Sequence, residues 1–182
     1  TPVYSELTLL PEPLVPAGLL ALFALGLWAL AGRSLSRPLR VGLLCSVSLI
    51  VAEAAKSELK YIFGRTWPET WINGNPSLMH DGVYGFNFFH GGQGYASFPS
   101  GHTAAICAVV SVLWICYPRF RVLYAAVVAA VAIGLIGADF HFLSDIIAGG
   151  FVGTTTGWFA LLLHGGELTK PSSANRPIGF LH

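Results

Sequence analysis

Charged side chains are scarce in this sequence. Only 10% of its 182 residues are Asp, Glu, Lys or Arg, whereas an ordinary soluble domain carries about 25%. With 54% hydrophobic residues, the chain has too few charges to coat a water-facing surface, which excludes an ordinary soluble domain. The formal net charge of +1 also gives no reason to expect nucleic acid as a partner, because binding to a phosphate backbone needs clustered Lys and Arg.

Cysteine is also rare, and the positions of the cysteines argue against a disulfide framework or a metal site. Cys45, Cys107 and Cys116 are odd in number and all lie in apolar stretches. We therefore expect these cysteines to be small buried hydrophobic residues.

Apolar runs dominate the sequence instead. Five of them are evident, at residues 14–32, 41–63, 103–117, 122–138 and 146–163. The first is long enough to cross about 30 Å of hydrocarbon as a helix. Only helices or closed barrels satisfy the backbone inside a membrane, and continuous runs differ from the alternating pattern of barrel strands. The sequence therefore predicts an all-α polytopic transmembrane helix bundle of about five spans, forming a single domain over residues 1–182.

Basic residues gather on one side of the predicted bundle. They are Arg33, Arg37 and Arg40 after the first span, Arg119 and Arg121 after the third, and Lys170 and Arg176 in the tail. The positive-inside rule predicts that this side, with the tail 165–182, is cytoplasmic and that residues 1–13 and 64–102 face outward. An outward N-terminus in a chain that begins at Thr1 is compatible with one preceding helix, which gives six spans in an untrimmed protein.

The outward segment 64–102 is long for a connecting loop. Loops of more than about 12–15 residues without secondary structure are uncommon unless they are functional. The segment is rich in aromatic residues, which is also typical of simple anchoring at the membrane interface. His80 and His90 lie within it and are expected to be solvated loop histidines.

Ionisable residues from three parts of the chain meet on the outward side. Lys56 and Lys60 share a helix face near the end of the second span, and His102 opens the third span. Charged groups at membrane depth are costly and usually face the protein interior or a pore. Taken singly, each lysine is also typical of a snorkelling anchor, and Glu53 is placed to pair with Lys56 within its own helix. The convergence of all of these residues favours a functional site.

Two histidines and an aspartate in this set suggest phosphoryl transfer. Asp145 follows His141 by four positions, so its carboxylate is placed to bind one ring nitrogen and leave the other to attack phosphorus. His102 is a candidate general acid for the departing oxygen. A lone histidine would more often be structural. The pattern nevertheless indicates a phosphohistidine mechanism, with His141 as nucleophile.

Four further residues are candidates for phosphate binding. Ser100 and Gly101 stand at the predicted start of a helix, where backbone N–H groups and the helix dipole attract anions. Lys60 and Arg65 are cations placed to hold the remaining phosphate oxygens and to stabilise the transition state.

At these residues the chain resembles the type 2 phosphatidic acid phosphatase superfamily, which also includes the vanadium haloperoxidases. The family motif Pro-Ser-Gly-His is complete at residues 99–102. The motif in which Lys is followed seven positions later by Arg-Pro is partial, because Lys60 and Pro68 are present but Trp67 occupies the Arg position.

The third family motif is also partial. It consists of Ser-Arg, five residues, His, three residues and Asp, and it keeps His141 and Asp145. Gly134 and Leu135 stand where Ser and Arg are expected, and the nearby Arg65 is a candidate to supply a missing guanidinium. The resemblance covers roughly residues 41–164.

The resemblance implies roles and an activity. His141 would be the nucleophile, Asp145 its orienter and His102 the acid for the leaving group. The activity would be metal-independent hydrolysis, without a cofactor, of a lipid phosphate or diphosphate, in the bacterial inner (plasma) membrane with the site facing the periplasm or exterior. A lipid phosphotransferase with the same site and a non-catalytic lipid-binding membrane protein stay open as alternatives. The lipid and the oligomeric state also stay open.

Overall fold

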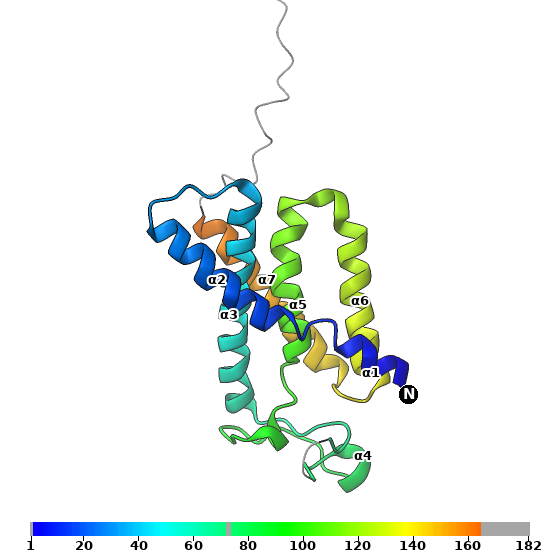
Figure 1. The fold of residues 1–182 in the computed structure, drawn as a ribbon. Helices are drawn as coiled ribbons and strands as arrows, with labels where there is room; N and C mark the ends of the chain where they lie inside the picture. Colours follow the sequence, from blue (N-terminus) through cyan, green and yellow to red (C-terminus); the bar gives the residue numbers. More distant parts are fainter. Residues whose placement is uncertain (1, 72–73, 165–182) are drawn as a thin grey trace, which may run out of the picture.

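The computed structural model describes residues 2–71 and 74–164, which form a bundle of helices (Figure 1). The elements in chain order are α1 (Pro2–Thr8), α2 (Leu14–Leu30), α3 (Arg37–Phe63), α4 (Leu78–Asp81), η1 (Gln93–Tyr95), α5 (Gly101–Cys116), η2 (Pro118–Phe120), α6 (Arg121–Gly137) and α7 (Leu143–Leu163). The prediction of an all-α polytopic bundle is confirmed. The tail 165–182, predicted to be cytoplasmic, lies outside the described residues.

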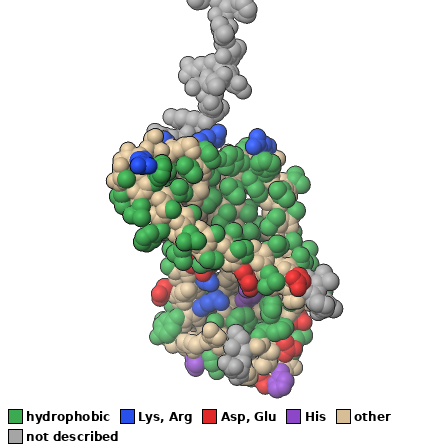
Figure 2. Space-filling model, in the orientation of Figure 1, with side chains coloured by type: hydrophobic (Ala, Val, Ile, Leu, Met, Phe, Trp, Pro, Cys, Tyr) green, Lys and Arg blue, Asp and Glu red, His purple; other side chains and the backbone are tan. Residues whose placement is uncertain are grey.

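Each of the five apolar runs forms a helix. By length and composition, α3, α7 and the continuous segment Pro118–Gly137 are able to cross a membrane, whereas α2 and α5 are shorter apolar helices. Large apolar side chains point away from the bundle, among them Phe151 at 72% and Leu163 at 88% exposed. Figure 2 shows hydrophobic side chains covering the helical part of the molecule. Because a water-soluble protein rarely exposes so much apolar surface, the chain is an integral membrane protein.

Glycines let α7 pack closely against α5. Gly149, Gly153 and Gly157 recur every fourth residue, so they form one stripe along α7. A Cβ atom at Gly153 would overlap the carbonyl oxygen of Ala104 and lie 2.7 Å from the backbone nitrogen of Ala108. Small residues are the usual means of close helix contact in membranes, where dispersion replaces the hydrophobic effect.

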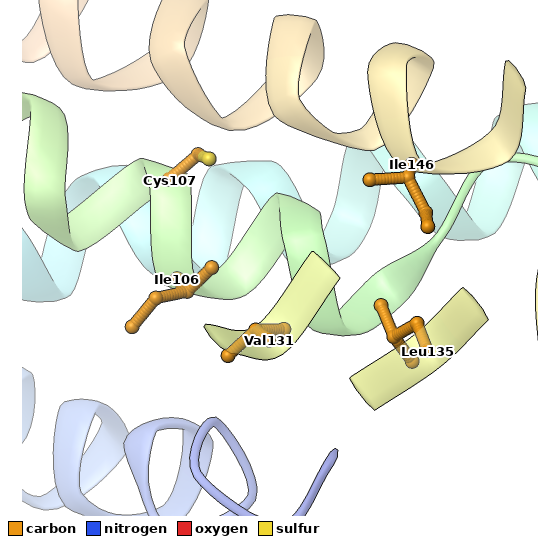
Figure 3. Close-up of a cluster of buried hydrophobic side chains, with 5 residues drawn as sticks. All are labelled: Ile106, Cys107, Val131, Leu135 and Ile146. Atoms are coloured by element: carbon orange, nitrogen blue, oxygen red, sulfur yellow. The ribbon is translucent and has the colours of Figure 1, made fainter. Parts of the chain in front are cut away.

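A buried apolar cluster joins three helices near the end of the bundle where α7 begins. Figure 3 shows Ile106 and Cys107 from α5, Val131 and Leu135 from α6, and Ile146 from α7. Leu135 is fully buried in this cluster. It stands at the Arg position of the third motif, and a buried guanidinium among these side chains would be strongly unfavourable without a partner. The cluster therefore accounts for this departure from the motif.

The N-terminal helix accounts for the second departure in that motif. Helix α1 packs on α6, where a Cβ at Gly134 would lie 2.7 Å from Cβ of Leu7 and 3.0 Å from the carbonyl oxygen of Tyr4. A Cβ at Gly137 would lie 2.6 Å from the ring of Tyr4. Glycine at position 134 thus allows α1 to contact α6.

The segment between α3 and α5 folds over one end of the bundle (Figure 1). Helix α3 ends at Phe63 and is capped by Gly64, whose φ of 51° is left-handed and whose missing Cβ leaves room for the carbonyl of Asn87. Isolated bridges from Arg65 to Phe86 and to Ala96 hold the loop together. Because α3 ends and α5 and α7 begin at this end of the bundle, the loop covers the end where the predicted site residues lie.

Candidate active site

A pocket of about 480 Å³, lined by both ionisable and apolar residues, lies at the loop-covered end of the bundle. Its ionisable lining residues are Glu12, Glu53, Lys56, Lys60, His102 and His141. They come from the N-terminal segment, α3, α5 and the connection between α6 and α7. Figure 2 shows acidic, basic and histidine side chains gathered in this region, below the hydrophobic surface.

The two predicted histidines face each other across this pocket. His102 belongs to the first turn of α5, and His141 precedes the start of α7. Their ring centroids are 6.4 Å apart with an interplanar angle of 67°. Reacting atoms in near-attack geometry are about 3–3.5 Å apart. The separation therefore suits one phosphorus-sized group contacted by both rings.

Asp145 lies behind His141, away from the pocket. Its Oδ2 atom is 3.5 Å from Nδ1 of His141, and both side chains are almost fully buried. Nδ1 of His141 makes no hydrogen bond with the described residues, so this is a close contact between the two groups, of a kind that commonly tightens when substrate binds. Burial lowers the pKa of His141 below its ordinary value, and the Asp145 carboxylate only partly opposes this effect. The lowered pKa favours the neutral form of the imidazole, which is the form able to act as a nucleophile.

His141 and His80 should have pKa values on opposite sides of the ordinary histidine value of about 6.5. His141 should stay neutral until the pH falls below that value, because burial lowers its pKa. His80 is exposed and bonded to Asp81, which raises its pKa, so it should lose its proton above that value. NMR titration of the ring protons, assigned with single histidine variants, measures both. A midpoint for His141 above that of His80 would contradict the structure.

Arg65 forms a buried ion pair with Asp145. Its Nη1 atom donates to Oδ1 of Asp145 at 2.5 Å and to the hydroxyl of Ser144 at 2.6 Å, and Nη2 donates to the Tyr84 hydroxyl at 2.8 Å. The guanidinium is 3% exposed and lies 4.3 Å from the centroid of the Phe142 ring. Arg65 is absent from the residues lining the pocket. Its role as a phosphate ligand stays a prediction, and this placement favours a role in neutralising Asp145 instead.

The loop and α7 supply further partners for the same carboxylate. The Ser97 hydroxyl donates to Oδ2 of Asp145 at 2.7 Å, and the backbone nitrogen of Phe142 donates to it at 3.1 Å. With Arg65 on the other oxygen, the fully buried carboxylate is held on several sides. Such satisfaction is what a buried charge requires.

The remaining predicted phosphate ligands divide into two groups. Lys60 and Gly101 line the pocket, and Nζ of Lys60 donates to the carbonyl of Ala96 at 2.5 Å. Ser100 is fully buried and caps α5, because its hydroxyl accepts from the backbone nitrogen of Thr103 at 3.4 Å. The structure thus places Lys60 and Gly101 with the two histidines and turns the Ser100 hydroxyl toward its own helix.

Trp67 is a pocket residue that the sequence did not mark as part of a site. Its ring lies 5.2 Å from that of His141, and Nζ of Lys60 lies 5.6 Å from its ring centroid. The indole nitrogen donates to the carbonyl of Gln93 at 2.8 Å, which fixes the ring. Its position in place of the motif arginine was the only sign in the sequence of a special role.

The N-terminal segment also reaches the pocket. Pro11, Glu12 and Val15 line it, because the packing of α1 on α6 carries the following residues across this end of the bundle. Nothing in the pattern of residues 1–13 indicated this contact.

Comparison with known proteins gives a consistent family. A model of the PAP2 superfamily matches residues 41–167. The chain is 35% identical over 88 residues to a protein named lipid A 1-phosphatase from Rhizobium etli, an alignment that covers 48% of this chain and 37% of that protein. It is 34% identical over 88 residues to a protein of the same name from Rhizobium johnstonii, covering 48% of this chain and 35% of that protein. The matched region thus spans little more than a third of the length of these relatives. No solved structure gives a significant match.

Proposed function

This chain belongs to the PAP2 superfamily, and we propose that it is a membrane phosphatase that hydrolyses a lipid phosphate or diphosphate through a phosphohistidine. The observation that carries the proposal is the 6.4 Å separation of the His102 and His141 rings in a pocket with several ionisable groups at one end of a membrane bundle. Ionisable groups at such a depth are costly and commonly mark a functional site.

In the first proposed step, Nε2 of His141 attacks phosphorus. The bond from phosphorus to the lipid oxygen breaks, and His102 gives its proton to that oxygen. In the second step, a water molecule attacks the phosphohistidine while His102 takes a proton from the water. The bond from phosphorus to nitrogen then breaks, which releases inorganic phosphate and restores both histidines.

The surrounding residues have supporting roles in this proposal. Lys60 and the backbone N–H groups at Gly101 hold phosphate oxygens and stabilise the charge that develops on them. Asp145 orients His141, and Arg65 keeps Asp145 in place through the bond at its Oδ1 atom. Ser100 contributes by capping α5, which fixes the position of the neighbouring His102.

The proposed location follows from the distribution of arginine. The connections from α2 to α3 and from α5 to α6 lie at the end of the bundle opposite the pocket (Figure 1). They carry Arg33, Arg119 and Arg121, so by the positive-inside rule this end would be cytoplasmic. The pocket would then face the periplasm or exterior from the plasma membrane. Lipid A 1-phosphate is the first substrate to test, because two relatives carry names with that activity.

The experiment is release of inorganic phosphate by purified protein in lipid nanodiscs. A panel of lipid phosphates is supplied without any acceptor lipid, and the reaction is repeated in EDTA. We expect release from at least one lipid at a rate that EDTA leaves unchanged, and a base-stable, acid-labile phosphoprotein after rapid quenching. Transfer that needs an acceptor lipid would favour a phosphotransferase, and no turnover under any condition would favour a lipid-binding protein.

Replacing Arg65 separates its two possible roles. Arg65→Met leaves the buried Asp145 carboxylate without its cation, which should lower the free energy of unfolding by about 3–5 kcal/mol. Thermal unfolding in detergent measures the loss, with Arg119→Met at the exposed opposite end as the control. An Arg65→Met protein with wild-type stability and only a raised KM would instead support the role of phosphate ligand.

A further inference from the structure

The pocket lacks the cations that the two incomplete motifs would supply. Trp67 and Leu135 occupy the arginine positions, and Leu135 is fully buried in the apolar cluster. The guanidinium of Arg65 is bonded to Asp145. A phosphate monoester nevertheless carries nearly two negative charges near neutral pH. The negative charge of a bound phosphate must therefore be balanced by other groups in the pocket.

The cationic residues that line the pocket are Lys56 and Lys60. They stand one helical turn apart on α3, so their side chains point to the same side. Lys60 is held by the carbonyl of Ala96, and its ammonium lies near the Trp67 ring. The proposed mechanism uses Lys60 but assigns no role to Lys56.

The ammonium of Lys56 lies against the first residue of α5. A Cβ at Gly101 would be 2.8 Å from Nζ of Lys56 and 3.3 Å from its Cδ atom. The absence of a side chain at Gly101 therefore makes room for this lysine. It also brings the ammonium to the helix N-terminus, beside His102, where backbone N–H groups already favour an anion.

Glu53 holds Lys56 at the pocket. The Nζ atom of Lys56 is 2.9 Å from Oε2 of Glu53, and the two side chains are 21% and 22% exposed. Both residues line the pocket. Pairs with this much solvent access contribute little net stability. A phosphate dianion, with more charge than a carboxylate, is therefore able to replace Glu53 as the partner of Lys56.

We propose that Lys56 is the second phosphate-binding cation of this pocket and that Glu53 is its counter-ion until the phosphate of the substrate arrives. Together Lys56 and Lys60 supply the positive charge that the motif arginines do not. The ligand class is a dianionic phosphate, either a terminal monoester or the outer group of a diphosphate. This assignment rests on the proposed function for its biological meaning.

The test measures phosphate affinity apart from turnover. Binding of radiolabelled inorganic phosphate is measured by equilibrium dialysis, and KM is measured with the best lipid phosphate. Lys56→Met should raise the Kd for phosphate about tenfold or more, because a charge-assisted hydrogen bond is lost. Lys56→Arg should restore most of the affinity. Thermal stability should be unchanged in both variants, since Lys56 is partly exposed.

Glu53→Gln should have the opposite effect. Removal of the competing carboxylate should lower the Kd for phosphate, and Glu58→Gln, an exposed change on the same helix, should not alter it. If Lys56→Met binds phosphate as tightly as the wild type, or if the wild type binds none, the assignment of Lys56 is wrong. Failure of the proposed function looks different: the wild type would bind phosphate in a Lys56-dependent way but release none from lipids.

Discussion

A His141→Ala variant should hydrolyse lipid phosphates at less than about a thousandth of the wild-type rate. The substitution removes the nitrogen to which the phosphoryl group is proposed to bond. It leaves Asp145 with its partners Arg65 and Ser97, so the buried carboxylate stays compensated and the fold should persist. Initial rates of phosphate release in nanodiscs measure the effect, and thermal unfolding in detergent checks the fold.

His80→Ala is the matched control for this change. His80 has the same chemistry, but its side chain is 72% exposed and bonded to Asp81 in the loop, outside the pocket. Its rate should equal that of the wild type. A His141→Ala protein that folds and keeps more than about a tenth of the wild-type rate would show that the nucleophile lies elsewhere.

The second large effect is expected far from the chemistry, at Gly153. Gly153→Ala places a methyl group against the backbone of α5, where it would overlap the carbonyl oxygen of Ala104 and lie 2.9 Å from Cβ of Cys107. Two helix backbones are not able to yield as a flexible side chain does. We expect a loss of about 2–3 kcal/mol in the free energy of unfolding. A shift of about 1 Å between α5 and α7 would also lower the rate by about a hundredfold, because His102 would move relative to His141.

Gly150→Ala provides the comparison on the same helix. Its Cβ would meet only Cγ2 of Thr103 at 3.6 Å and Sγ of Cys107 at 3.8 Å, which are ordinary contacts. Both substitutions gain the same helix propensity, about 1 kcal/mol in favour of alanine. The difference between their melting temperatures and rates therefore isolates the clash with α5. Equal values for the two variants would mean that α7 does not pack on α5 through Gly153.

The bundle was predictable because its determinants are local. Each apolar run is continuous along the chain, and lipid allows few backbone structures other than a helix. The sequence also indicated that Lys60, His102, His141 and Asp145 meet, because each lies at the same end of a span. These residues lie close together in the structure because of the order and direction of the helices alone.

Other features depend on contacts between distant segments, which leave no local pattern. The role of Arg65 as a phosphate ligand stays a prediction, whereas its bonds to Asp145 and Ser144 arise from the way in which the loop folds back on α7. The approach of Lys56 to Gly101 depends on the distance between α3 and α5. Trp67 departs from a motif in the sequence, while its contact with the His141 ring arises only when the loop folds against the start of α7.

In the proposed mechanism, the bond between Arg65 and Asp145 makes the reactivity of His141 depend on a loop segment that mostly lies outside the pocket. Tyr84 and Phe86 surround the guanidinium from the loop, although neither lines the pocket. Under the proposed mechanism, a substitution at Pro11, Glu12 or Val15 would alter contacts with the ligand directly, because these residues line the pocket. A substitution at Tyr84 or Phe86 would instead act on His141 indirectly, through Arg65 and Asp145.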